Sequence, residues 1–183
     1  MTRKEALDSV KENVESKNLI KHMLATEAIM RALARRLDED EEEWGLTGLL
    51  HDIDVELTGG DMSSHSRLGA DLARELGAGD AIAHAILTHN PAHGVPCQAK
   101  LDKALYCADP LTGLIIAAAL IRPDKKLAGL EAKSVQKRFK EKRFAPGADR
   151  EQISSCSELG LEFDEFIELG LTAVKGIADT LGL

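Results

Sequence analysis

Apolar side chains recur every three to four residues along most of this chain, the spacing that gathers them on one face of an α-helix. The segment 18–37 shows the pattern clearly, with one face that carries Leu19, Met23, Thr26, Met30, Leu33 and Leu37. No segment of the chain predicts a β-strand. The pattern therefore predicts an all-α fold.

Helix-breaking residues divide this pattern into separate elements. We expect helices at 2–15, 18–37, 38–51, 65–76, 79–89, 98–109, 111–121, 131–143 and 162–181. Loops are expected at 53–64, which contains Gly59-Gly60, and at 90–96, which starts with Asn90-Pro91. Pro110 should interrupt or kink the helical run around it. Asp149 and Gln152 have the spacing of a helix-capping box.

Composition agrees with a helical core and disfavours some classes of function. Hydrophobic residues make up 44% of the chain but aromatic residues only 3%, so Leu, Ala and Ile must fill the core. The net charge of −8 disfavours binding to a nucleic acid duplex, whose phosphates repel an acidic protein. We see no apolar leader, and the apolar run 114–121 is too short to cross a bilayer. A cytoplasmic protein without membrane contact is expected.

The three cysteines, Cys97, Cys107 and Cys156, suggest no special chemistry. Their number is odd and no two have the CxxC spacing, so neither a disulfide framework nor a thiolate zinc site is indicated.

Polar side chains with metal-binding groups stand on several of the apolar faces. His22, His65, His89 and Asp109 each share a face with Leu, Ile, Met or Ala, whereas His51 follows Leu49-Leu50 at a helix end. His84 falls on another face and His93 in a loop. One such histidine is usually a hydrogen-bonded core residue. Several together, with buried carboxylates, indicate a shared divalent cation, because an unpaired buried charge costs several kcal/mol.

The stretch "GLLHDID", residues 48–54, places His51 and Asp52 side by side. Within a helix, neighbouring side chains point about 100° apart, so the two could hardly share an ion. At a helix end the backbone turns away. We therefore expect the helix to end here, so that both side chains reach the same site.

These residues resemble the HD-domain superfamily of metal-dependent phosphohydrolases. The resemblance lies in the order His22, His51-Asp52, His65, His89 and Asp109, and in the segments "GLLHDID", "SSHSRLGADLARELG", "AILTHN" and "LDKALYCAD". It implies a helical bundle around a metal site, with a metal-binding core at about 18–122. Residues 123–183 would extend that core within a single domain, 1–183. Asp54 and Val55 depart from the usual glycine and lysine of the family signature.

The resemblance also implies roles for the six residues. His22, His51, Asp52 and Asp109 would hold one ion, and in two-metal members Asp52 would bridge to a second ion held by His65 and His89. Asp52 is the catalytic candidate. Asp54 and Asp61 are weaker acid–base candidates, because loop carboxylates are usually solvated. The mixed nitrogen and oxygen donors suit Mn, Fe, Ni, Co or Zn, in one or two ions, better than Mg or Ca.

The predicted function is hydrolysis of a phosphate ester or anhydride by metal-activated water, with a small phosphorylated molecule, most simply a nucleotide, as substrate. Two alternatives remain. Some HD proteins resemble di-iron oxygenases, and others serve as non-catalytic signalling modules.

The segment 131–150 carries a net charge of +4 in an otherwise acidic chain, from seven basic and three acidic residues. We expect a solvated helix face, or a contact with the acidic run 38–43 of a second copy in a homodimer. The functional alternative is that Lys137, Arg138 or Lys142 binds the phosphate of the substrate.

Overall fold

The computed structural model describes all 183 residues and contains only helices and the turns between them, which confirms the predicted all-α fold. Two long helices, α2 (Lys17–Leu37) and α6 (Lys100–Leu120), run through its centre. The other elements are α1 (Arg3–Asn13), α3 (Glu41–Leu50), α4 (Arg67–Glu75), α5 (Asp80–His89), η1 (Pro91–His93), α7 (Ala132–Lys140), α8 (Arg150–Ser154), η2 (Ser155–Leu159), α9 (Phe163–Lys175) and α10 (Ala178–Leu181).

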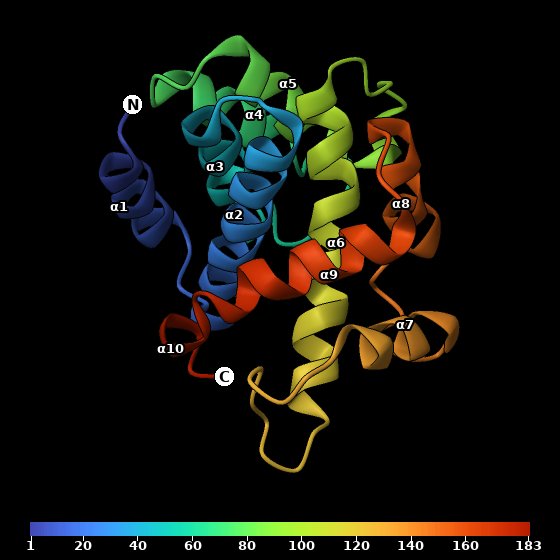
Figure 1. Cartoon of the computed structure of the whole chain (residues 1–183). Helices are drawn as coiled ribbons and strands as arrows, with labels where there is room; N and C mark the ends of the chain where they lie inside the picture. Colours follow the sequence, from blue (N-terminus) through green and yellow to red (C-terminus); the bar gives the residue numbers. More distant parts are fainter.

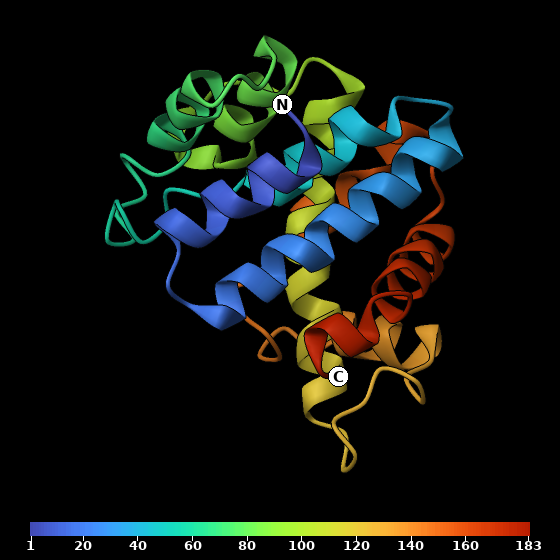
Figure 2. The same ribbon diagram turned by 90° about the vertical axis from the view of Figure 1, so that its left-hand side faces the viewer.

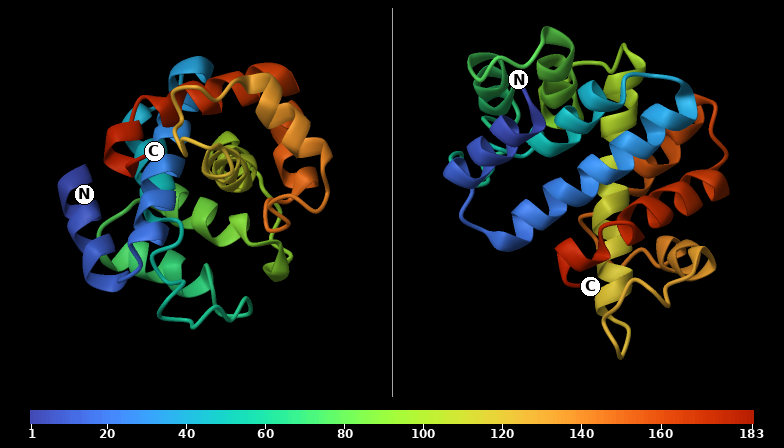
Figure 3. Two further views of the ribbon diagram at one scale, coloured as in Figure 1. Left: turned by 90° about the horizontal axis from the view of Figure 1, so that it is seen from below. Right: turned by 60° about the vertical axis from the view of Figure 1, so that its left-hand side comes forward.

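The remaining helices surround α6, which is seen end-on in the left-hand view of Figure 3. α9 crosses both α2 and α6 (Figure 1), and α1 packs on α3 at the outside of the bundle (Figure 2). α6 is the one helix long and apolar enough to span a membrane by length and composition, yet 61% of that stretch is buried within the protein. Its apolar character is that of a core helix.

α6 continues through Pro110, so the prediction of separate helices at 98–109 and 111–121 was wrong. A proline inside a helix removes one hydrogen bond and typically costs about 3 kcal/mol. Here both neighbouring turns are held by buried side chains, among them Leu105, Leu111 and Leu114, none of which is exposed. Packing on all sides therefore outweighs the loss at Pro110.

The close approach of α2 and α3 depends on a glycine. A Cβ atom on Gly48 would lie 2.9 Å from the backbone N and Cα of Glu27 in α2, closer than real Cβ atoms come. The two helices thus touch backbone to backbone at this point. One turn further along α3, this contact places His51 beside His22 of α2.

Apolar side chains form two clusters, and α2, α3 and α5 contribute to both. Met23 and Ile86 belong to the cluster with α1, α3 and α4, whereas Ala25 and Ala85 belong to the cluster with α6 and the C-terminal helices. The buried hydroxyls of Thr26 on α2 and Thr112 on α6 are also linked, at 3.2 Å. The central helices are therefore fixed against one another near the positions of His22 and Asp109.

Two further local predictions need correction. The helix expected at 65–76 begins only at Arg67, and His65 lies in the turn before it. Asp149 caps α8 as predicted, by accepting hydrogen bonds from the backbone N–H groups of Glu151 and Gln152. The Gln152 side chain, however, donates to the carbonyl of His89 at 3.4 Å, so the reciprocal half of the capping box is replaced by a tertiary contact.

Candidate metal centre

The six predicted ligands come together in space, from five separate parts of the chain. His22 lies on α2, His51 and Asp52 follow α3, His65 precedes α4, His89 ends α5 and Asp109 lies midway along α6. α3 does end at Leu50, so His51 and Asp52 stand where the backbone turns, as predicted. Their convergence is a feature of the tertiary fold, because the six span 88 positions of sequence, from 22 to 109.

One group, called here the first half-site, consists of His22, His51 and Asp109. The Nε2 atom of His22 lies 2.9 Å from Oδ1 of Asp109 and 3.2 Å from Nε2 of His51. The His51 Nε2 atom lies 3.6 Å from the same Asp109 oxygen. This half-site reaches the surface, since the side chains of His22 and Asp109 are 21% and 28% exposed.

The other group, the second half-site, consists of His65 and His89. Their rings are 5.2 Å apart between centroids and nearly perpendicular, and both side chains are buried. Four imidazoles thus form a continuous row, because His51 also meets His89 edge-on, at 5.3 Å. The second half-site is the enclosed end of the row.

Asp52 lies between the two half-sites and directs one carboxylate oxygen to each. Its Oδ2 atom lies 3.3 Å from Nε2 of His51 and 3.7 Å from Nε2 of His22. Its Oδ1 atom lies 3.5 Å from Nε2 of His65 and 3.6 Å from Nε2 of His89. The carboxylate can therefore contribute one oxygen to each of two ions.

Hydrogen bonds orient three of the four imidazoles toward this centre. Nδ1 of His51 faces the carbonyl of Gly48 and Nδ1 of His89 faces the carbonyl of Ile86. A carbonyl only accepts, so in the neutral form of both rings Nδ1 carries the proton and Nε2 presents a lone pair to the cluster. Nδ1 of His65 faces the carboxylate of Asp54 with the same consequence. A fixed ring with a free Nε2 is typical of metal-ligating histidines.

The donor set fits a divalent transition metal. Two groups of side chains, His22-His51-Asp52 and Asp52-His65-His89, each have their ligand atoms within 4.8 Å of one another. Lone pairs of two imidazole nitrogens at 3.2 Å repel unless a proton or a cation lies between them. Neutral imidazoles with carboxylates are ligands that Mn, Fe, Ni, Co and Zn all accept. The identity of the metal is not fixed by these donors.

Charge coupling within the cluster favours its ionised forms. Burial opposes protonation of His51, but Asp52 and Asp109 outweigh this and raise the pKa of His51 well above its usual value. Burial likewise opposes ionisation of Asp52 and Asp109, but His51 and His22 hold the pKa of each carboxyl below its usual value. Without a metal, protons therefore take the place of the cation.

Asp54 is not the solvated loop carboxylate that the sequence suggested; it is fully buried. It accepts hydrogen bonds from Nδ1 of His65 at 2.9 Å and from the backbone N–H groups of Ser66 and Gly69 at 2.7 and 2.9 Å. The side chain of Asp61, by contrast, is exposed and bonds only to nearby Ser63 and Ser64, as a loop carboxylate should. The sequence did contain a signal for this residue. Asp54 is a second carboxylate two positions after Asp52, where the family signature usually has a glycine.

Two more residues that sequence reasoning missed hold the backbone of His65. The side-chain amide of Asn90, which is buried, donates to the carbonyls of Met62 and His65. Nε2 of His93 contacts the same His65 carbonyl at 2.6 Å. The loop after α5 thus supports the turn that carries a candidate ligand.

His84 lies outside the cluster, as its helical face predicted. Its Nδ1 atom is 3.0 Å from Oδ2 of Asp102, a buried carboxylate that also accepts from the backbone N–H groups of Gln98 and Ala99. Asp102 therefore caps the start of α6. Its burial has a structural explanation and needs no metal.

The basic segment is a separate feature of the molecule. α7 packs against α6 and α9, beside the C-terminal half of α6 in Figure 1. Arg138 forms an ion pair with Glu141 and lies over the ring of Phe144, whereas Lys137 and Lys142 are exposed. No hydrogen bond or ion pair joins these three residues to the six candidate ligands, so their role in binding phosphate stays a prediction.

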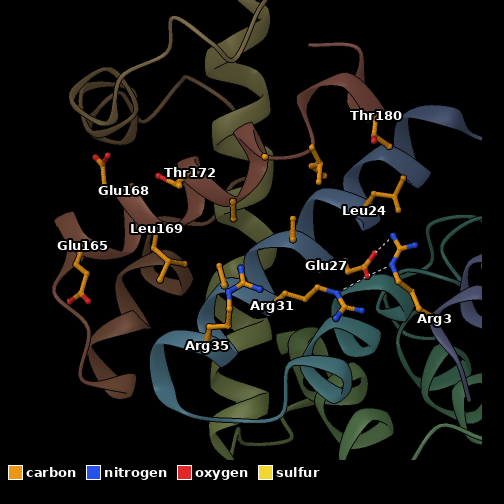
Figure 4. A pocket seen from close by; sticks show the side chains of 15 residues that line it. Arg3, Leu24, Glu27, Arg31, Arg35, Glu165, Glu168, Leu169, Thr172 and Thr180 are labelled. Atoms are coloured by element: carbon orange, nitrogen blue, oxygen red, sulfur yellow. Dashed lines mark hydrogen bonds and ion pairs between the residues drawn. The ribbon is translucent and has the colours of Figure 1, made fainter.

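A cavity of about 760 Å³ is also separate from the cluster. It lies between α2 and α9 and none of the six candidate ligands lines it (Figure 4). At its edge, the buried carboxylate of Glu27 is held between Arg3 and Arg31, at 2.6 and 2.9 Å. These charges satisfy each other, which gives them a role in joining α1 to α2.

A family model described as HD domain matches residues 19–120, more than half of the chain. The chain therefore belongs to the HD domain family, which confirms the resemblance seen in the sequence. No solved structure matches it.

Curated relatives include proteins named Ribonuclease Y. The one from Oleidesulfovibrio alaskensis is 33% identical over 98 residues, which are 54% of this chain and 18% of the relative. The one from Sulfurovum sp. is 30% identical over 166 residues, or 88% of this chain and 32% of the relative. The chain spans about a fifth to a third of the length of these proteins.

Proposed function

We propose that this protein is a metal-dependent phosphohydrolase that cleaves a phosphate ester bond of a ribonucleotide, either free or at the end of a short single-stranded RNA. The observation that carries the proposal is Asp52, whose two oxygens face two separate sets of imidazole nitrogens. Membership of the HD domain family supports the hydrolytic chemistry. The name of the relatives, Ribonuclease Y, supports a ribonucleotide phosphodiester as the substrate class.

The metal would be held by His22, His51, Asp52 and Asp109, and a second ion by Asp52, His65 and His89. When bound there, a divalent metal supplies Lewis acidity for a phosphoryl oxygen and lowers the pKa of an attacking water. The neighbouring histidines hold the pKa of Asp52 down, so its ionised carboxylate would act as a metal ligand and not as a proton donor.

The exposed edge of the first half-site gives the direction of substrate entry. His22 and Asp109 are its partly exposed members, whereas His51, His65 and His89 are buried. A phosphate can therefore approach past His22 and Asp109, while the second half-site excludes bulk water. The net charge of −8 disfavours long or double-stranded nucleic acid and favours a short substrate with few phosphates.

The test is a hydrolysis assay with Mn²⁺ or Fe²⁺ and four substrates: a nucleoside monophosphate, bis-p-nitrophenyl phosphate, a short single-stranded RNA and the same RNA as a duplex. We expect release of phosphate or nucleotide from at least one single-stranded or free substrate, and little cleavage of the duplex. Asp52→Ala should remove the activity and His84→Ala should retain most of it.

The four substrates distinguish a nuclease from a nucleotidase, because either enzyme would break a phosphate ester bond at this site. Faster turnover of RNA than of the monophosphate identifies a nuclease, and the reverse identifies a nucleotidase. No hydrolysis with either metal, together with oxygen consumption by the iron-loaded protein, would refute the proposal in favour of an oxygenase.

A further inference from the structure

Asp54 has an unusual position for a carboxylate: it is buried completely and touches no candidate ligand except His65. Its two oxygens have different partners. Oδ1 faces Nδ1 of His65, whereas Oδ2 accepts from the backbone N–H groups of Ser66 and Gly69. The side chain therefore links the turn after the His-Asp pair to the start of α4.

The surrounding backbone is shaped to admit this carboxylate. Ser66 has φ of +68°, a left-handed conformation that costs a residue with a side chain about 1–2 kcal/mol. A Cβ atom on Gly69 would lie 3.0 Å from Oδ1 of Asp54, so a larger residue would press on it. The chain thus accepts a strained residue and a glycine at the positions that hold Asp54.

The consequence for His65 is a fixed tautomer. A carboxylate oxygen can only accept, so the proton of a neutral His65 resides on Nδ1 and its Nε2 lone pair faces Oδ1 of Asp52, 3.5 Å away. His51 and His89 obtain the same orientation from carbonyls within their own helical turns. His65 lies outside any helix and has no such carbonyl; Asp54 supplies the acceptor instead.

We propose that Asp54 is a positioning residue that makes the second half-site competent to bind a metal ion, by fixing the ring of His65 with Nε2 unprotonated. The inference rests on the proposed metal-binding function but concerns only one of the two half-sites. It assigns no role to Asp54 in the first half-site, since Asp54 contacts none of its members.

Asp54→Asn tests this with little change in shape. The two backbone N–H donors at Oδ2 require an oxygen there, so the amide nitrogen must occupy the position of Oδ1 and point its hydrogens at His65. His65 would then accept at Nδ1 and carry its proton on Nε2, where a metal would have to bind. The cap of α4 is retained, in contrast to Asp54→Ala, which removes it as well.

The first measurement is calorimetric titration of each protein with Mn²⁺, combined with elemental analysis. We expect Asp54→Asn to keep the affinity of the first ion and to weaken the second about 10–100-fold, the usual effect of losing a partner behind a ligand. Asp61→Asn, an exposed carboxylate of the same loop, is the matched control and should bind both ions normally.

The second measurement is ¹⁵N NMR of the histidine side chains in chelator-treated protein, at an alkaline pH above which the His65 signals no longer change. The proton of His65 should lie on Nδ1 in the wild type and on Nε2 in Asp54→Asn. A purely structural role of Asp54 would not move this signal. The proposal is overturned if Asp54→Asn binds two ions as the wild type does, or if its His65 keeps the proton on Nδ1.

Failure of the proposed function would give a different result from failure of the proposal for Asp54. A wild-type protein that binds no Mn²⁺ contradicts the metal-dependent activity and the role of Asp54 in metal binding together. Two ions in both proteins contradict only the role of Asp54.

Discussion

The two half-sites of the cluster share Asp52 but are constructed differently. The first is partly open to solvent and is assembled from three helices, through the contact of α2 with α3 and of α2 with α6. The second is buried, and the ring of His65 is held by the side chain of Asp54, while Asn90 holds the backbone carbonyl of the same residue. The difference indicates that helix packing determines the geometry of the first half-site, whereas a local hydrogen-bond network determines that of the second.

The largest effect is expected from replacing Asp52, the residue that the two half-sites share. Asp52→Ala removes an oxygen from each half-site and should lower the rate of hydrolysis about a thousandfold or more, corresponding to several kcal/mol of lost transition-state stabilisation. It should also reduce metal content and abolish the rise in Tm on adding Mn²⁺. His84→Ala is the control. Equal loss in both variants would contradict the assignment of the cluster.

Replacing one candidate ligand at a time should weaken metal binding at one half-site and leave the other unchanged. His22→Ala should weaken the first ion about 100-fold, and His89→Ala should weaken the second by a similar factor while the first remains bound. Calorimetric titration with Mn²⁺ measures both. If either variant loses both ions, the half-sites are not independent and the comparison above is wrong.

Gly48→Ala should disturb the first half-site through packing alone. The added methyl group meets the backbone of Glu27, so α2 and α3 must separate, at a cost of about 1–3 kcal/mol in the free energy of unfolding. The distance between His22 and His51 should increase and the first ion should bind more weakly. Gly113→Ala, with open space around its Cβ, is a matched control in a helix. Urea unfolding and Mn²⁺ titration together check the prediction.

Metal binding should depend on pH because it displaces protons. The pKa values of His51 and His65 are raised, so each holds its proton to a higher pH than a free imidazole would. The affinity for Mn²⁺ should therefore rise about tenfold per pH unit for each proton released, up to the raised pKa values. Calorimetry in buffers of different ionisation enthalpy counts the protons. An affinity that does not change between pH 6 and 8 would contradict this linkage.

The same pKa shifts determine how the stability of the metal-free protein depends on pH. A raised histidine pKa stabilises the fold at low pH, and the benefit is lost as pH rises through that pKa. A lowered carboxyl pKa, as in Asp52 and Asp109, stabilises the fold above the ordinary carboxyl range and is lost on acidification. Metal-free protein should therefore lose stability on both sides of a window between these ranges, as thermal unfolding across pH can show.

The smallest effect concerns α7. If Lys137, Arg138 or Lys142 contacts the substrate phosphate, replacing all three by Ala should raise KM about tenfold without changing metal content. Lys125→Ala removes one exposed positive charge outside this segment and is the control for each of the three single replacements. Unchanged kinetics in the triple variant would leave α7 as a solvated or dimer-forming face.

The residues that share an apolar face with hydrophobic side chains were predictable from the sequence. His22, His89 and Asp109 stand at helical spacings from Leu, Ile or Met, and the end of α3 at His51-Asp52 follows from the need for both side chains to reach one site. The all-α fold and the HD domain family were likewise evident from periodicity and from the order of these residues.

What the sequence did not show depends on three-dimensional packing. From the sequence alone Asp54 resembles a solvated loop carboxylate, because its hydrogen-bond partners Ser66 and Gly69 are 12 and 15 residues away. Asn90 was missed for the same reason, because the carbonyls of Met62 and His65 that it binds are 28 and 25 residues away. Pro110 was read as a break, although burial of the neighbouring turns holds α6 together. Local propensity does not include these tertiary contacts.

The central claim, that one carboxylate bridges two metal half-sites, is tested most directly by the metal content of the purified protein before and after saturation with Mn²⁺. We expect at least one tightly bound transition metal per chain, two after saturation, and an electron paramagnetic resonance signal of two coupled Mn²⁺ ions that Asp52→Ala removes. A protein that contains no metal, and whose Tm is unchanged by Mn²⁺ or Fe²⁺, would contradict it.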